Sequence, residues 1–144
     1  MDDPASVVSL LDAGGAPHGF LRGRDGEFTT IDVPDALVTL VFDINDRGQM
    51  AGTYVDAGGR VRGFRRNRSG EVTTIDAPGA VQTRVRGINN RGQIAIDTVD
   101  PQLVHHGYLL DRGRFTEIRP RGALGNGSLA TDVDDRGRVL GWVI

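Results

Sequence analysis

Cysteine and lysine are both missing from this 144-residue chain. Without cysteine there is no disulfide, no thiol nucleophile and no thiolate ligand for a metal. A zinc site would have to use the three histidines together with carboxylates, and we expect no bound metal. Because lysine is absent, all 17 basic residues are arginines. This bias reflects either the codon usage of a GC-rich genome or the recognition of carboxylate and phosphate groups.

The chain also lacks an excess of positive charge and any long apolar run. Its net charge of −2 argues against a dedicated nucleic-acid-binding protein, which normally carries a basic excess. No apolar stretch approaches the ~20 residues of a transmembrane helix. The N-terminal sequence MDDPASVV carries acids where a signal peptide needs positive charge. We therefore expect a cytoplasmic protein with no nucleic-acid or membrane partner.

Glycine, in contrast, is abundant. The chain contains 21 glycines, well above the usual ~7%. They follow no three-residue period, which excludes a collagen-like helix. An excess of this kind is typical of many short strands joined by tight turns.

The sequence repeats with a period of 44 residues, as the spacing of Gly19, Gly63 and Gly107 shows. The string TTIDVP at 29–34 returns as TTIDAP at 73–78 and degenerates to TEIRP at 116–120. Internal repeats of this length indicate an array of similar structural units. Three such units span the chain after a short leading segment, over 18–61, 62–105 and 106–144.

Each unit contains four short extended segments, predicted in the first unit over 18–22, 27–33, 38–45 and 49–55. The last two segments are separated by Asn-Asp-Arg-Gly, which becomes Asn-Asn-Arg-Gly and Asp-Asp-Arg-Gly in the later units. Asn and Asp tolerate left-handed backbone and glycine adopts positive φ freely, so this string predicts a hairpin turn. A leading strand is predicted over 5–12, because SLLDAGGAPHGF matches TYVDAGGRVRGF.

Four strands in a unit of this length are typical of a propeller blade. We therefore predict an all-β fold, with a single domain over 1–144 and three four-stranded propeller-like blades in each chain. Three blades leave open edges, so a homodimer that forms a six-bladed β-propeller is expected. The alternative is a β-trefoil monomer, which also uses three units and closes within one chain. The pairing of the leading strand stays open.

The strings HGF at 18–20, FTTIDVP at 28–34 and INNRGQI at 88–94 resemble the HAF repeat. This repeat is found mostly in bacterial extracellular repeat proteins. The resemblance runs from His18 to the C-terminus and implies a propeller-like fold, without assigning catalytic residues. HAF proteins usually carry more copies and an export signal, so this chain looks like a shorter cytoplasmic derivative.

Residues that break the repeat are the better candidates for function, because the repeat itself serves folding. Asp43 and Asp132 stand where the second unit has Gly87. Each is either a turn-stabilising or solvent-facing carboxylate, or an acid/base group facing the centre of a ring. Arg84 and Arg86 replace apolar residues of the first unit. They form either an exposed blade edge or a clamp for a carboxylate, enolate or phosphate.

Three further candidates lie along the later strands. Asp97 and Trp142 occupy the position of Thr53 in the first unit. Trp142, the only tryptophan, either packs in the core or a dimer seam, or forms a ligand-stacking wall together with Tyr54. His105 lies outside the repeat pattern. It is either an exposed loop residue or, if buried beside an aspartate such as Asp97 or Asp132, a proton shuttle.

Two classes of function follow. The first is a cofactor-independent enzyme of the cyclase, lyase or isomerase type in bacterial secondary metabolism, with Asp43, Asp97, Asp132 and His105 as acid/base candidates. The second is a non-catalytic propeller module that binds a small molecule or a protein. Carbohydrate binding ranks lower, because one Trp and two Tyr supply few stacking surfaces. A propeller fold by itself does not decide between these classes.

Overall fold

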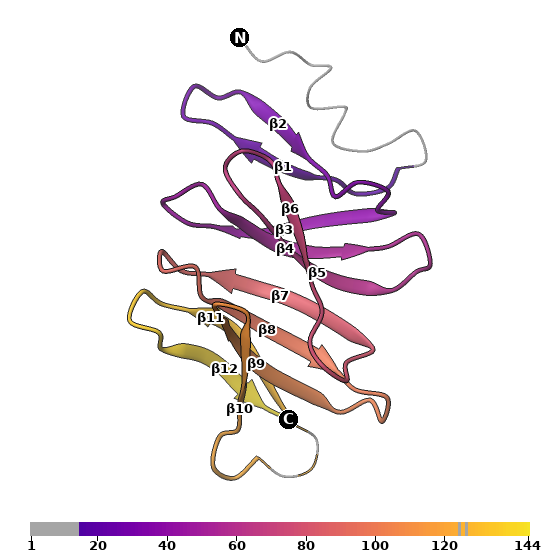
Figure 1. Cartoon of the computed structure of the whole chain (residues 1–144), viewed down its shortest axis with the longest axis vertical. Helices are drawn as coiled ribbons and strands as arrows, with labels where there is room; N and C mark the ends of the chain where they lie inside the picture. Colours follow the sequence, from indigo (N-terminus) through magenta and orange to yellow (C-terminus); the bar gives the residue numbers. More distant parts are fainter. Residues whose placement is uncertain (1–14, 124, 126) are drawn as a thin grey trace.

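A computed structural model describes residues 15–123, 125 and 127–144 of the chain. The predicted all-β class is confirmed: the described residues form twelve strands in four sheets and contain no helix. Figure 1 shows the sheets stacked one above another in chain order, with β1 and β2 at one end of the stack and β11 and β12 at the other. The predicted leading strand over 5–12 lies outside the described residues.

Two of the sheets have four strands and two have only two, and all paired strands are antiparallel. The N-terminal half sheet contains β1 (Gly19–Arg22) and β2 (Phe28–Ile31). The first complete sheet contains β3 (Val38–Ile44), β4 (Met50–Val55), β5 (Val61–Arg66) and β6 (Val72–Ile75). The second contains β7 (Gln82–Ile88), β8 (Ile94–Val99), β9 (His105–Asp111) and β10 (Arg114–Ile118). The C-terminal half sheet contains β11 (Ser128–Val133) and β12 (Val139–Val143).

The sheets do not share the boundaries of the sequence repeat. All four strands predicted in the first unit form, but β1 and β2 lie in one sheet and β3 and β4 in the next. The described residues therefore form two complete sheets and two half sheets instead of three four-stranded blades. Among the described residues no sheet closes on itself, as the single-chain trefoil alternative would require.

Neighbouring sheets approach closely at the repeated glycine. A Cβ atom on Gly63 would lie 2.5 Å from a methyl group of Val85 in the next sheet. Gly19 and Val41 repeat this contact at the preceding interface. No larger residue fits without moving the sheets apart, which explains why this glycine recurs in every unit. The core between the two complete sheets is formed by packed aliphatic side chains: Ile75, Val85, Ile88, Ile94, Ile96 and Leu110.

The Asn-x-Arg-Gly turns also join one sheet to the next. Asn45 Oδ1 accepts hydrogen bonds from the backbone amides of Arg47 and Gln49, which closes its own turn. Asn45 Nδ2 donates to the carbonyl of Asn89 in the following turn at 3.0 Å. Asn89 in turn donates to the carbonyl of Asp134 at 2.8 Å. The repeated string is therefore conserved within the chain for two reasons, the turn itself and the stacking of turn on turn.

We predict that Asn89→Asp lowers the free energy of unfolding by about 2–3 kcal/mol. Asn89 is buried, and the variant keeps the acceptor oxygen for the turn but loses both Nδ2 hydrogen bonds, to the Asp134 carbonyl and to Gln93 Oε1. The loss leaves two acceptor oxygens facing a buried carboxylate. Urea unfolding at a fixed chain concentration measures the change. The matched control is Asp134→Asn in the last turn, expected to cost less than about 1 kcal/mol; equal effects of the two variants would contradict the stacking role.

Candidate functional site

The most unusual buried residue is Asp97, in the middle of β8 with no solvent-exposed surface. Its equivalent in the first complete sheet is Thr53, which has a structural task. The Thr53 hydroxyl accepts a hydrogen bond from the Val85 amide of the next sheet at 3.1 Å and donates one to the Val85 carbonyl at 3.4 Å. A carboxylate cannot donate and is costly to bury, so the replacement of Thr by Asp is not explained by sheet stacking.

Three predicted site residues surround this carboxylate. His105 Nδ1 lies 3.1 Å from Asp97 Oδ1. Arg84 Nη1 and Arg86 Nη2 lie 3.5 and 3.6 Å from Oδ2. The strand register explains the convergence: Arg84 is directly opposite Asp97, and His105 precedes by two residues Gly107, the partner of Asp97 on β9. The two arginines, predicted to clamp a ligand anion, thus face an anion of the protein itself.

Asp97 Oδ2 accepts no hydrogen bond from any described residue, although it is buried. The guanidinium groups stabilise its charge but lie beyond hydrogen-bonding distance. Other contacts hold both arginines: Arg86 lies over the ring of Phe42 at 5.6 Å, and Arg84 Nη2 donates to Gln82 Oε1 at 2.6 Å. A buried carboxylate oxygen left without a hydrogen-bond donor is uncommon in a protein core and marks this cluster as a functional candidate.

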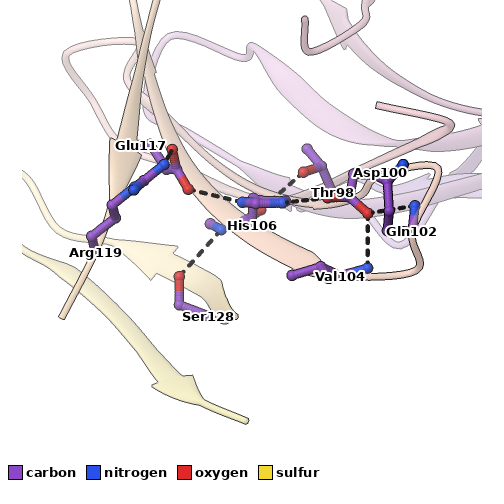
Figure 2. Close-up of polar contacts among 9 residues, drawn as sticks. Thr98, Asp100, Gln102, Val104, His106, Glu117, Arg119 and Ser128 are labelled. Carbon is purple, nitrogen blue, oxygen red and sulfur yellow. Dashed lines mark hydrogen bonds and ion pairs between the residues drawn. The ribbon is translucent and has the colours of Figure 1, made fainter. Parts of the chain in front are cut away.

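A second polar network is centred on His106, the next residue along β9 (Figure 2). Its Nε2 lies 2.9 Å from Asp100 Oδ2, and its Nδ1 lies 2.8 Å from Glu117 Oε1. Arg119 donates to the other oxygen of Glu117 at 2.7 Å. Figure 2 shows Asp100 on one side of the imidazole and Glu117 with Arg119 on the other. The ring is thus held between two carboxylates.

The carboxylates determine the protonation of this network. The hydrogen bonds to Asp100 and Glu117 raise the pKa of His106, and its partial burial opposes this shift without reversing it. The hydrogen bond from His106 lowers the pKa of Asp100. The pKa of Glu117 is also lowered, chiefly by its hydrogen bond from Arg119 and then by that from His106. All three shifts favour the charged forms.

The preceding sheet contains a related network with a different base. There Arg62 contacts the carboxylates of Asp56 and Asp76. A basic residue between two carboxylates thus occurs in both complete sheets, as Arg62 in the first and as His106 in the second. The pair formed by Glu117 and Arg119 has no counterpart in the first. Sequence reasoning did not select these two residues as candidates, although the change from TTIDAP to TEIRP marks their position.

A cavity of about 240 Å³ lies beside both histidines. Its opposite wall is the segment after β10, held against the sheet by Gly127, which forms a β-bridge with His105. Gly127 has a φ of 100°, and a Cβ atom there would overlap the His105 carbonyl oxygen. The described lining residues are Val104, His105, His106, Glu117, Arg119, Pro120, Ala123, Gly125, Gly127 and Ser128.

His105 connects the buried cluster with this cavity. Its side chain is 28% exposed and lines the cavity, while its Nδ1 is bound to Asp97. Nε2 has no hydrogen-bond partner among the described residues. The arrangement leaves one ring nitrogen available for proton exchange with a molecule in the cavity. Over the same described part of the chain, no three His, Asp or Glu side chains converge as ligands of a metal ion would.

The other two acid/base candidates are not brought to this cluster. Asp43 accepts hydrogen bonds from its neighbour's amide and from the amide of Ile88 in the next sheet, at 3.0 Å. Asp132 accepts from the amide of Val133 at 2.9 Å. Its carboxylate packs where Gly87 leaves room, since a Cβ atom on Gly87 would lie 2.6 Å from Asp132 Oδ1. Both aspartates lie at the register shift of their strand, where their carboxylates accept hydrogen bonds from backbone amides.

Tyr54 and Trp142 do not form a common pocket wall, contrary to the prediction. Tyr54 is buried in the first complete sheet, where its hydroxyl is 2.8 Å from Thr74 Oγ1 and its ring packs edge-on against Phe64. Trp142 lies on β12 and is 59% exposed. The repeat equivalence of Trp142 and Thr53 could not reveal this difference, because β4 has a strand partner on both sides whereas β12 pairs with β11 alone among the described residues.

Comparison with known proteins adds no identification. No protein-family profile matches the chain, and a search of curated proteins finds no significant match. The resemblance to the HAF repeat therefore stays a prediction. No helix in the described part of the chain has the length and apolar character needed to cross a bilayer.

We predict a pH-dependent contribution of His106 to stability. Its raised pKa means that the contribution is full below the ordinary value of ~6.5 and is lost as pH rises through the raised value. His106→Gln should therefore lower the free energy of unfolding more at about pH 5.5 than at about pH 8.5. Chemical denaturation at both pH values measures the difference.

Arg62→Gln is the control, because arginine does not titrate in this range. Its effect should be the same at both pH values. A His106→Gln effect that does not decrease with rising pH would contradict the assigned network.

Proposed function

We propose that this protein handles a small molecule in the cavity beside His105, with His105 and Asp97 as a proton-transfer pair. The observation that carries the proposal is the fully buried Asp97 carboxylate, which replaces a structural threonine and contacts His105 at 3.1 Å. A buried acid that orients a partly exposed imidazole is a common arrangement for general acid–base catalysis.

The proposed chemistry needs only the residues of the chain. Asp97 Oδ1 accepts a hydrogen bond from Nδ1–H, which leaves the lone pair on Nε2. Nε2 takes a proton from an acidic C–H or O–H group of the substrate, and Asp97 stabilises the resulting imidazolium. The same nitrogen returns the proton to another atom of the substrate. The result is an isomerisation, or a cyclisation or elimination with the same proton balance, without change of oxidation state.

Charge supports an anionic substrate. Arg119 lines the cavity, and its side chain is 76% exposed, so its remaining N–H groups can reach a carboxylate or enolate. Arg84 and Arg86 do not serve this purpose in the proposal, because they face Asp97 and are not among the described residues that line the cavity. We therefore propose a cofactor-independent enzyme of the cyclase, lyase or isomerase type that acts in bacterial secondary metabolism.

A second candidate is a non-catalytic binding module. This candidate is favoured because both ring nitrogens of His106 are already engaged, by Glu117 and by Asp100. Of the two histidines that line the cavity, only His105 then has a ring nitrogen without a partner among the described residues. Such a wall can hold an anion without reacting with it. Carbohydrate binding is less favoured, because no Trp, Tyr or Phe side chain is found among the described lining residues.

For the architecture we propose a six-bladed β-propeller formed by two chains. The proposal is supported by the face-to-face stacking of short antiparallel sheets and by the half sheets at both ends. Each chain supplies two complete sheets and two halves, so two chains supply six four-stranded sheets in total.

The proton-transfer proposal predicts that His105→Gln and Asp97→Asn slow catalysed proton exchange at least ~10²-fold. The measurement is deuterium incorporation next to the carbonyl of a panel of small keto acids in D₂O, followed by proton NMR. Asp132→Asn is the control and should exchange like wild type. Binding of the same acids without exchange by wild type would favour the binding module, and unchanged binding and exchange in both variants would refute the proposal.

A matched variant separates function from folding. Asp97→Thr restores the residue of the preceding unit and removes a buried charge, while the two arginines, each about one-third exposed, stay partly hydrated. We predict that its free energy of unfolding is equal to or higher than that of wild type, whereas proton exchange is lost. A loss of more than about 2 kcal/mol in urea unfolding would instead assign Asp97 a structural role.

A further inference from the structure

We propose that β12 of one chain pairs with β1 of a second copy of the chain, so that the two half sheets form one complete four-stranded sheet at each of two junctions. This inference specifies the interface of the two-chain ring proposed above. It does not depend on the proposed chemistry at His105.

The two half sheets are complementary parts of the same sheet. β1 and β2 pair in the register of β5 and β6: Gly19 lies opposite Ile31 as Gly63 lies opposite Ile75. They therefore correspond to the third and fourth strands of a complete sheet. β11 and β12 correspond to the first and second strands, because they pair with the same register shift in the first strand that interrupts β3 and β7. When β11 and β12 of one chain are joined to β1 and β2 of the other, they form a sheet with all four strands.

Large apolar side chains are exposed on β1 and β12, each of which has one edge without a strand partner among the described residues. Phe20 on β1 is 51% exposed, whereas its equivalent Phe64 in the complete sheet is fully buried. On β12, Leu140 and Trp142 are 68% and 59% exposed, whereas the equivalent residues of β4 are buried. Exposed apolar residues on a strand with free backbone N–H and C=O groups predict pairing with another strand.

The chain cannot satisfy these edges by pairing its own half sheets. They lie at opposite ends of the stack, with two complete sheets between them (Figure 1). A second copy related by a twofold axis covers both edges at once. It also closes the assembly, whereas a head-to-tail contact that does not close produces an open polymer.

The complete sheets predict the register of the new pair. The second and third strands pair with Gly52 opposite Phe64 and with Ala51 opposite Arg65. The equivalent residues place Gly141 opposite Phe20 of the second copy and Leu140 opposite Leu21 of the second copy. Directly opposite residues in an antiparallel pair have Cα atoms about 4.5–5.5 Å apart, within the range that a disulfide can bridge.

The test uses the absence of cysteine from the chain. In the double variant Leu21→Cys, Leu140→Cys, mild oxidation should link most chains into a dimer of twice the chain mass of 15.5 kDa on a non-reducing gel. The control pair Ser69→Cys, Leu140→Cys places one thiol on the exposed turn between β5 and β6 and should stay largely unlinked. Light scattering of the cysteine-free wild type should give the dimer mass without any cross-link.

Several outcomes would overturn the inference. They are a wild-type mass of one chain at micromolar concentration, unlinked thiols in the Leu21→Cys, Leu140→Cys variant, a disulfide within one chain, or a ladder of trimers and larger species. A ladder would show a head-to-tail contact that does not close with two copies. None of these outcomes depends on ligand binding or proton exchange, so the interface and the proposed function can fail separately.

Discussion

The structure depends on the close stacking of one short sheet upon the next. Each complete sheet has only four short strands and buries apolar side chains on the faces turned to its neighbours. The gap between sheets is set by glycine, as at Gly63 against Val85. Polar contacts then fix the alignment: the Thr53 hydroxyl bonds the Val85 amide, and the Asn45 and Asn89 side chains link successive turns. The residues that recur in the sequence repeat are those that make these contacts.

The same stacking explains where a functional site can arise. In one unit, a side chain at a given position forms a hydrogen bond to the next sheet. The equivalent side chain of another unit can differ where no such hydrogen bond forms. Asp97 occupies such a position, and its carboxylate interacts with His105, Arg84 and Arg86 of its own sheet instead. The site thus lies where the chain departs from its repeat, beside the incomplete C-terminal sheet. The change from Thr53 in one sheet to Asp97 in the next both removes a contact between sheets and creates the polar cluster.

Much of this organisation is visible in the sequence, but not the grouping of strands into sheets. The periodic strings locate the strands and turns of the first unit correctly. They do not reveal that the connection from β2 to β3 crosses to the next sheet while that from β4 to β5 is a hairpin, because Asp-Val-Pro-Asp and Asp-Ala-Gly-Gly both predict a turn. The cluster around Asp97 could be predicted because each member breaks the repeat. The importance of Glu117 and Arg119 becomes visible only through the contact of Glu117 with His106. The exposure of Trp142 is set by the open edge of β12 among the described residues rather than by any local sequence pattern.

The central claim is that stacking of sheet on sheet is inseparable from the fold itself. Hydrogen exchange at the Val85 amide tests it most directly, because this N–H donates across the interface to Thr53. The account predicts that this amide exchanges only through global unfolding, with the same free energy as the slowest amides inside β8. Exchange at a clearly lower free energy, while the amides of β8 stay protected, would mean that the sheets separate without unfolding and would contradict the account.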